Sequence, residues 1–175
     1  MANIDLSQVP SFYHGYIQLV PEGKLNNLFE NHQVELLSFL KEIPENSWGY
    51  RYTEGKWTIG EMVQHIIDAE RIFAYRALRF ARKDSTPLAG FDENTFAASS
   101  KADQRNSRDL MDELSTVQKS SAQLFGSFDD EQLDQYGVAN NNKVSVRAIG
   151  YILIGHALHH MRILKERYRT GIWGD

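Results

Sequence analysis

Three histidines are the residues of this chain whose types and spacing could do chemistry together. His156 and His160 stand four residues apart, so on a helix both imidazoles lie on one face, one turn apart. Two ligands from a single helix hold one divalent metal ion at this spacing. Taken alone, such a pair is more often two core histidines satisfied by hydrogen bonds, and both interpretations stay open at this point.

His65 supplies a third imidazole. It lies beside Met62 and Ala69, on the border of its helix's apolar face, from which it can turn inward. Three imidazoles in a helical core would be costly to leave unpaired, and a metal ion removes that cost while leaving open positions, as catalytic sites do. His159 is the alternative to His160, but the helical wheel places it toward the edge of the apolar stripe, where an orienting or surface role is expected.

Acidic residues near His65 are candidates for orienting the imidazoles. Asp68 and Glu61 flank His65 at positions i+3 and i−4, where either could hold its free ring nitrogen or simply face solvent. Glu70 lies within the apolar stripe, where a carboxylate is rarely unpaired. We expect it in an ion pair or hydrogen bond, with Arg147 or a tyrosine, or else as the partner of a ligand histidine or a general base.

Four helices must position these residues. Apolar residues recur at three- and four-residue steps in four segments, which predicts four long helices. Thr58 and Glu61 form a capping box at the start of the second helix, and Ser145 caps the last one. An all-α four-helix bundle is the natural architecture, and bundles build metal sites from side chains on facing helices. The expected helices span residues 24–41, 58–82, 107–125 and 145–168.

The remaining segments are expected to be short or irregular. Residues 1–20 should form a short helix or an arm whose aromatic side chains, from Phe12 to Tyr16, pack on the bundle. A short helix is expected near 129–135, followed by a turn at Asn140–Asn142. No convincing strand is predicted, and residues 84–102 are the least regular part of the chain.

Length and composition exclude several classes of protein. A chain of 175 residues fits a single domain spanning 1–175. The absence of cysteine excludes disulfides, zinc–thiolate sites, iron–sulfur clusters and a cysteine nucleophile. The total of 19 Lys and Arg against 23 Asp and Glu gives a net charge of −4, which argues against a nucleic-acid partner. The basic residues Arg76, Arg79, Arg82 and Lys83 stand where a helix dipole favours cations.

No membrane partner is expected either. The N-terminus carries an early acid and no apolar stretch of the kind that a signal peptide has. The longest apolar stretch, residues 148–158, is too short to span a bilayer. We therefore expect a soluble, cytoplasmic protein.

Two pairs of motifs carry a family resemblance. One pair is Tyr50-Arg51-Tyr52-x-x-Gly55-Lys56-Trp57-Thr58 with His65-x-x-Asp68-x-Glu70-Arg71. The other is Val144-Ser145-Val146-Arg147-Ala148 with Gly155-His156-x-x-His159-His160. Together they resemble the DinB-like superfamily, and more narrowly its DinB_2 branch, over about Tyr13–Tyr168. The blocks around His65 and His156 are the most specific.

This resemblance implies a fold, a metal and a class of reactions. The implied fold is a four-helix bundle with an up-down-down-up chain path. The implied cofactor is a divalent metal, nickel or zinc, held by His65, His156 and His160. Some relatives transfer low-molecular-weight thiols to electrophiles, and members are often homodimers.

Two functional hypotheses follow. The first is a metal-dependent enzyme for a small-molecule substrate, with thiol transfer as the first expectation and metal-assisted hydrolysis as the second. Because the chain has no cysteine, a sulfur nucleophile would have to come from a bound cosubstrate. The second hypothesis is a non-catalytic metal-binding stress or interaction protein. A pocket that opens the histidines to solvent beside a substrate-sized cleft would favour the enzyme.

Overall fold

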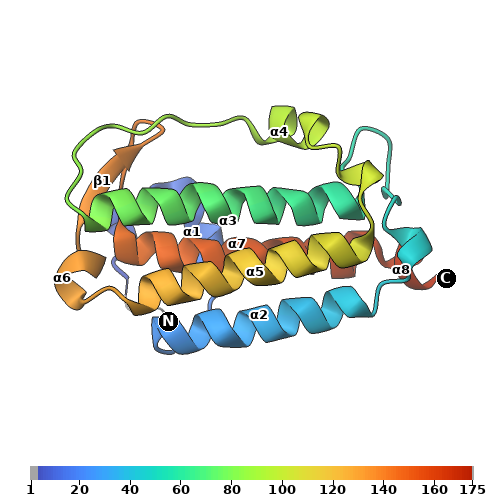
Figure 1. Ribbon diagram of the computed structural model, residues 1–175, viewed down its shortest axis with the longest axis horizontal. Helices are drawn as coiled ribbons and strands as arrows, with labels where there is room; N and C mark the ends of the chain where they lie inside the picture. Colours follow the sequence, from blue (N-terminus) through green and yellow to red (C-terminus); the bar gives the residue numbers. More distant parts are fainter. Residues whose placement is uncertain (1–3, 175) are drawn as a thin grey trace.

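Four long helices form a bundle in the computed structural model, which describes residues 4–174 (Figure 1). They lie within two residues of the predicted positions at each end, and the predicted fold class is confirmed. The long helices are α2 (Leu25–Lys41), α3 (Ile59–Ala81), α5 (Ser107–Gly126) and α7 (Val146–Arg167). The short elements are the 3-10 turns Leu6–Gln8, Ser11–Tyr13, Glu45–Ser47 and Ala102–Gln104 and the helices α1 (His14–Ile17), α4 (Glu93–Ser99), α6 (Asp130–Leu133) and α8 (Arg169–Trp173).

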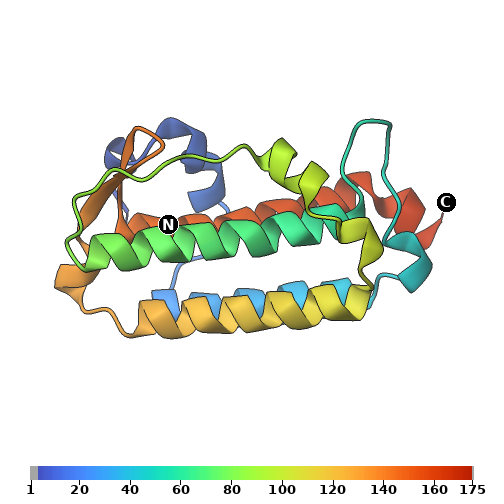
Figure 2. The same ribbon diagram turned by 45° about the horizontal axis from the view of Figure 1, so that its top comes forward.

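The chain follows the up-down-down-up path. Helices α3 and α5 run in one direction, and α2 and α7 run in the other (Figures 1 and 2). Two parallel helices cannot be joined by a tight turn, so residues 82–106 cross back along the whole length of the bundle and carry α4 with them. Helix α3 packs on both α5 and α7. His65 on α3 therefore faces the helix that carries His156 and His160.

Local sequence signals explain where the two site-bearing helices begin. The Thr58 hydroxyl accepts a hydrogen bond from the Glu61 backbone N–H at 3.1 Å, and the Thr58 N–H donates to the Glu61 carboxylate at 2.7 Å. This is the predicted capping box, and it starts α3. Ser145 accepts from the Ala148 N–H at 3.1 Å and starts α7. Both predicted caps are confirmed.

The apolar stripe of α7 is buried. Ile149, Leu153, Ala157 and Leu164 are each at most 1% exposed. Burial continues around most of the helix because α2, α3 and the N-terminal α1 all pack on it. Among residues 4–174, no helix is long and apolar enough to span a membrane.

A β-hairpin corrects the expectation of no strand. Strand β1 (Tyr136–Ala139) pairs antiparallel with β2 (Asn142–Ser145). The turn residues Asn140 and Asn141 have φ values of +48° and +60°, a left-handed conformation that asparagine tolerates and that matches the twist of a two-residue hairpin. Leu88 also pairs with Ala139, which joins the crossover segment to the hairpin.

Two further short helices were not expected. Within the segment treated as irregular, the Asp92 carboxylate accepts from the Thr95 N–H at 2.7 Å and starts α4. The second unexpected helix, α8, follows directly after α7 ends at Arg167.

The N-terminal segment lies against α7. Ile17 is 3% exposed, and Tyr13 and Tyr16 are half-buried. Gly155 permits this contact, since a Cβ at that position would lie 2.1 Å from the backbone oxygen of Tyr16. Phe12 departs from the expectation because its side chain is 57% exposed.

Gly155→Ala should therefore displace the N-terminal segment and destabilise the protein. The clash is with backbone, which cannot rotate away, so we expect a loss of about 1–3 kcal/mol in the free energy of unfolding, measured by urea titration. Gly15→Ala is the matched control, because nothing lies within 4 Å of a Cβ there. Equal stability of the two variants would contradict this account of the contact.

Candidate metal centre

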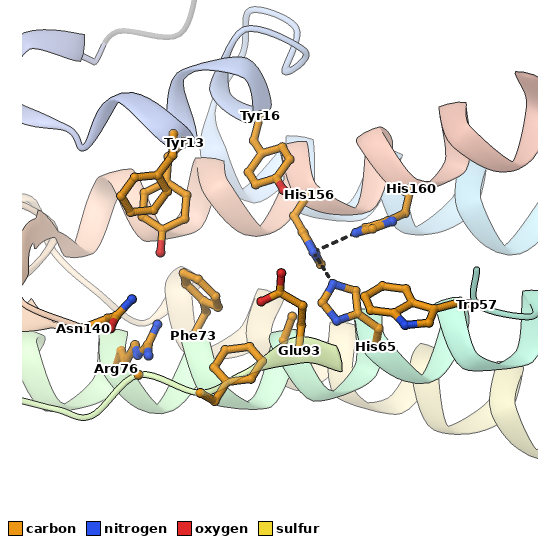
Figure 3. Close-up of a pocket in the computed structure, with 14 residues that line it drawn as sticks. Tyr13, Tyr16, Trp57, His65, Phe73, Arg76, Glu93, Asn140, His156 and His160 are labelled. Atoms are coloured by element: carbon orange, nitrogen blue, oxygen red, sulfur yellow. Dashed lines mark hydrogen bonds between the residues drawn. The ribbon is translucent and has the colours of Figure 1, made fainter. Parts of the chain in front are cut away.

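The structure brings His65, His156 and His160 together. Nε2 of His156 lies 2.9 Å from Nε2 of His65 and 3.0 Å from Nε2 of His160. One ring nitrogen from each residue can be chosen so that all three lie within 4.8 Å of one another. Figure 3 shows the three rings meeting between α3 and α7. Among residues 4–174, this is the group of histidines and carboxylates with the spacing of a metal site.

Neighbouring aromatic rings hold the imidazoles in position. The Trp57 ring centroid lies 4.7 Å from that of His65, and the Tyr16 ring meets His156 edge-on at 5.5 Å. The backbone oxygen of Trp57 accepts a hydrogen bond from the Tyr168 hydroxyl at 2.8 Å. The segment before α3 and the end of α7 are thus tied together beside the histidines. Trp57 also lines the cavity beside the histidines.

Burial keeps the three imidazoles neutral at physiological pH. It lowers the pKa of His65 to about 4 and the pKa values of His156 and His160 well below the usual 6.5, and repulsion from neighbouring charged histidines lowers the pKa values of His156 and His160 further. Neutral imidazoles have the free lone pair that a metal ion needs.

Hydrogen bonds among the three histidines cannot satisfy all of their ring nitrogens. An imidazole nitrogen carries either one N–H or one lone pair, so Nε2 of His156 cannot make good hydrogen bonds to both neighbours. Nδ1 of His160 is buried and has no hydrogen-bond partner among residues 4–174. A cation shared by the three Nε2 atoms would satisfy all three lone pairs at once. The residues present therefore fit a divalent metal ion.

A cavity of about 310 Å³ adjoins the histidines, which form part of its wall. Its apolar lining comes from Phe12, Ala69, Phe73 and Phe91. Its polar lining, besides the histidines, comes from Tyr13, Tyr16, Arg76, Glu93 and Asn140. A volume of this order suits a small organic molecule.

Glu93 is a polar group of this cavity that sequence reasoning missed. Its carboxylate points into the cavity toward Tyr16 and the histidines (Figure 3). Burial and then the nearby Glu93 charge raise the pKa of the Tyr16 phenol, which reflects the same proximity. Asp92 followed by Glu93 and Thr95 is a helix-start pattern that could have predicted α4 and placed Glu93 in its first turn.

Arg76 is the second missed residue. It was expected to interact with the dipole at the end of α3, but its side chain is 4% exposed and lines the cavity. The available signal was its spacing of eleven residues from His65, which puts both on one face of α3.

The acids proposed to orient the histidines form other contacts. The Glu61 carboxylate accepts the Thr58 N–H in the capping box. The Asp68 carboxylate accepts from the Gln64 side chain at 2.9 Å. Within residues 4–174, neither is hydrogen-bonded to an imidazole.

Glu70 lies on a different side of α3 from the histidines. Its side chain is 1% exposed and faces the Ser121 hydroxyl of α5, while its Oε1 atom has no partner among the described residues. The expectation of Arg147 as its partner is wrong, because Arg147 pairs with Asp130 and Asp134 near the hairpin. Burial raises the pKa of Glu70 to about 7.

His159 lies beside the group without joining it. Its ring contacts Tyr16 at 5.1 Å and His160 at 5.2 Å between centroids, and it is half-exposed. His160 is the residue of this turn whose Nε2 meets the other two histidines.

Comparison with known proteins agrees with the motifs. The family model described as DinB superfamily matches residues 28–164. Among solved structures, the fold is similar to YfiT from Bacillus subtilis, described as a probable metal-dependent hydrolase with an unusual four-helix bundle topology. The TM-score is 0.74 at 14% identity, over 83% of this chain and 84% of that one. No curated protein matches the sequence.

Proposed function

Because this chain belongs to the DinB superfamily, we propose that it is a metal-dependent hydrolase of small molecules, with a divalent ion held by His65, His156 and His160. The observation that carries the proposal is the meeting of three neutral imidazoles in the wall of a cavity of about 310 Å³. A structural site would be closed by a fourth protein ligand, whereas three histidines leave room for water and substrate.

The chain's own residues have separable roles in such a reaction. When bound, the ion would act as a Lewis acid and lower the pKa of a coordinated water. The Glu93 carboxylate faces the histidines and accepts the proton that the attacking water loses. The Tyr16 hydroxyl lies in the same part of the cavity, where it donates a hydrogen bond to the substrate. The Trp57 ring shields the histidines on the opposite side.

Glu93 is the reason to prefer hydrolysis over thiol transfer. A carboxylate beside the histidines suits the removal of a proton from water, and it would repel an incoming thiolate. The description of YfiT as a probable hydrolase agrees with this preference. Nickel and zinc both remain proposals for the ion, since imidazole binds either.

Glu93→Gln is the test of this assignment. We expect kcat to fall by about 10²–10⁴-fold against the best ester or amide found in a screen, with unchanged metal content. Glu30→Gln, an exposed acid on α2, is the matched control and should keep full activity. Full turnover by Glu93→Gln would exclude Glu93 as the base. Consumption of a low-molecular-weight thiol without any hydrolysis would favour the transferase instead.

The homodimer implied by the resemblance also remains a prediction. Light scattering during size-exclusion chromatography tests it directly, and a mass of one chain would contradict it.

A further inference from the structure

Arg76 of α3 is a buried cation that the chemistry proposed at the histidines does not use. Its side chain is 4% exposed. Arginine is rarely this buried unless it is paired, and its guanidinium does not lose its proton in proteins. Within residues 4–174, no carboxylate oxygen lies within 4.0 Å of its guanidinium nitrogens. A positive charge without a protein counter-ion is therefore held in the wall of the cavity.

Neutral contacts fix the orientation of this guanidinium. One Nη atom donates to the backbone oxygen of Ala89 at 3.0 Å. The guanidinium carbon lies 4.9 Å from the Phe73 ring centroid and 6.0 Å from that of Phe91. These contacts hold the planar group in place and use only part of its five N–H donors. They do not neutralise its charge.

Two further hydrogen-bonding groups lie at the same end of the cavity. Figure 3 shows the Asn140 amide beside the Arg76 guanidinium and the Tyr13 hydroxyl pointing toward both of them from across the cavity. Burial raises the pKa of Tyr13 above its usual 10, so this hydroxyl stays protonated and can donate. Asn140 is held by the hairpin turn and by the bond from its N–H to the Leu88 oxygen at 3.0 Å.

Gly90 leaves the room that Asn140 needs. A Cβ on Gly90 would lie 2.4 Å from Oδ1 of Asn140. The crossover segment and the hairpin, which are far apart in sequence, thus meet beside Arg76. Tyr13 from the turn before α1, Arg76 from α3 and Asn140 from the hairpin turn therefore line the same end of the cavity.

The cavity consequently has two chemically different ends. Arg76 follows His65 by eleven residues, or about three turns and 16 Å of helix axis, on the same face of α3. The histidines and Glu93 lie at one end, and Arg76, Tyr13 and Asn140 lie at the other (Figure 3). A molecule bound along the cavity would present one group to each end.

A carboxylate fits the Arg76 end better than a phosphate does. The guanidinium fork matches the two oxygens of a planar carboxylate, with neutral donors beside it. One positive charge neutralises a monoanion, whereas a phosphate dianion would retain an excess charge in a cavity that also holds Glu93.

We propose that Arg76, Tyr13 and Asn140 form a carboxylate-binding subsite, and that the substrates are small carboxylic acids with their reactive bond several atoms away from the carboxylate. The binding of a carboxylate stands on Arg76 and its neighbours alone. The identity of the substrate class rests on the function proposed above.

Binding of a matched pair of probes tests the subsite. N-benzoylglycine and its primary amide have nearly the same shape and differ in the carboxylate charge. We expect calorimetric titration of the purified protein to show at least about tenfold tighter binding of the acid, and Arg76→Met to remove this preference. Arg82→Met removes one exposed positive charge from the same segment outside the cavity, and it should bind like wild type.

A second variant guards against misfolding. Arg76→Lys keeps the charge and loses the planar fork, so it should retain only part of the preference. Equal binding of acid and amide by wild type would overturn the proposal, and so would an unchanged preference in Arg76→Met. Inorganic phosphate that displaces N-benzoylglycine more strongly than equimolar acetate does would overturn the choice of carboxylate.

Failure of the subsite can be told apart from failure of the hydrolase. An Arg76-dependent preference for the acid without hydrolysis of any compound would leave the subsite intact and remove the proposed function. Hydrolysis of acidic and neutral substrates with equal kcat/KM would support the proposed function and exclude the carboxylate subsite. An acid that is hydrolysed with a KM raised about 10- to 100-fold by Arg76→Met, at little change in kcat, would support both.

Discussion

His160→Ala is expected to abolish tight metal binding. Its Nε2 lies 3.0 Å from that of His156, and three imidazoles are the candidate ligands of the site. Loss of one of three ligands should leave no more than about one-tenth of the wild-type metal content after desalting, because even loss of an orienting partner costs about 10–100-fold in affinity. Inductively coupled plasma mass spectrometry of the purified proteins measures this content.

His159→Ala is the matched control for that experiment. It removes an imidazole from the adjacent position without touching the three converging nitrogens, so its metal content should stay near that of wild type. Equal metal retention by the two variants would contradict the ligand assignment. Loss confined to His159→Ala would mean that the neighbouring residue is the ligand.

Glu70→Gln should remove a loss of about 3 kcal/mol in the free energy of unfolding that the wild-type protein shows as the pH rises from 4.5 to above 7. The pKa of Glu70 is about 7 in the folded protein and near 4.5 when the chain is unfolded. Between these values the folded state binds more protons, so the wild-type protein loses stability as pH rises from 4.5 to 7. A shift of about 2.5 pH units corresponds to about 3 kcal/mol, a cost that the uncharged glutamine avoids.

Thermal melting at pH 4.5 and pH 8 measures this difference. The melting temperature of Glu70→Gln relative to wild type should rise by roughly 6–12 °C between the two pH values. The buried histidines are the same in both proteins, so their contribution to the pH dependence cancels in the comparison. Glu30→Gln, at an exposed site, should show no such trend. Parallel curves for Glu70→Gln and wild type would show that Glu70 is not held neutral by burial.

The helices could be predicted because their signals are local. The capping box at Thr58, the cap at Ser145 and the apolar stripe through Ile149 and Leu153 each depend on residues within a few positions of one another. The hairpin was missed although its turn was recognised. Its strands have four residues each and depend on pairing with Leu88 of the distant crossover segment.

The histidine site needed more than periodicity. A helical wheel places His156 and His160 on one face, but it cannot say which helix lies opposite; the family resemblance supplied that pairing. Glu93 and Arg76 were missed because their importance depends on where the crossover segment passes over α3. Arg76 looked like an ordinary helix-end cation until the structure placed it under Phe73 and Phe91.

The proposed function requires that His65, His156 and His160 hold one metal ion. Anomalous diffraction from crystals of the metal-loaded protein, collected above and below the absorption edge of the metal, tests it most directly. We expect one strong anomalous peak about 2.0–2.2 Å from Nε2 of all three histidines, on the side that faces the cavity with Glu93. A peak bound by His159, or no peak among the three imidazoles in protein shown to contain metal, would contradict it.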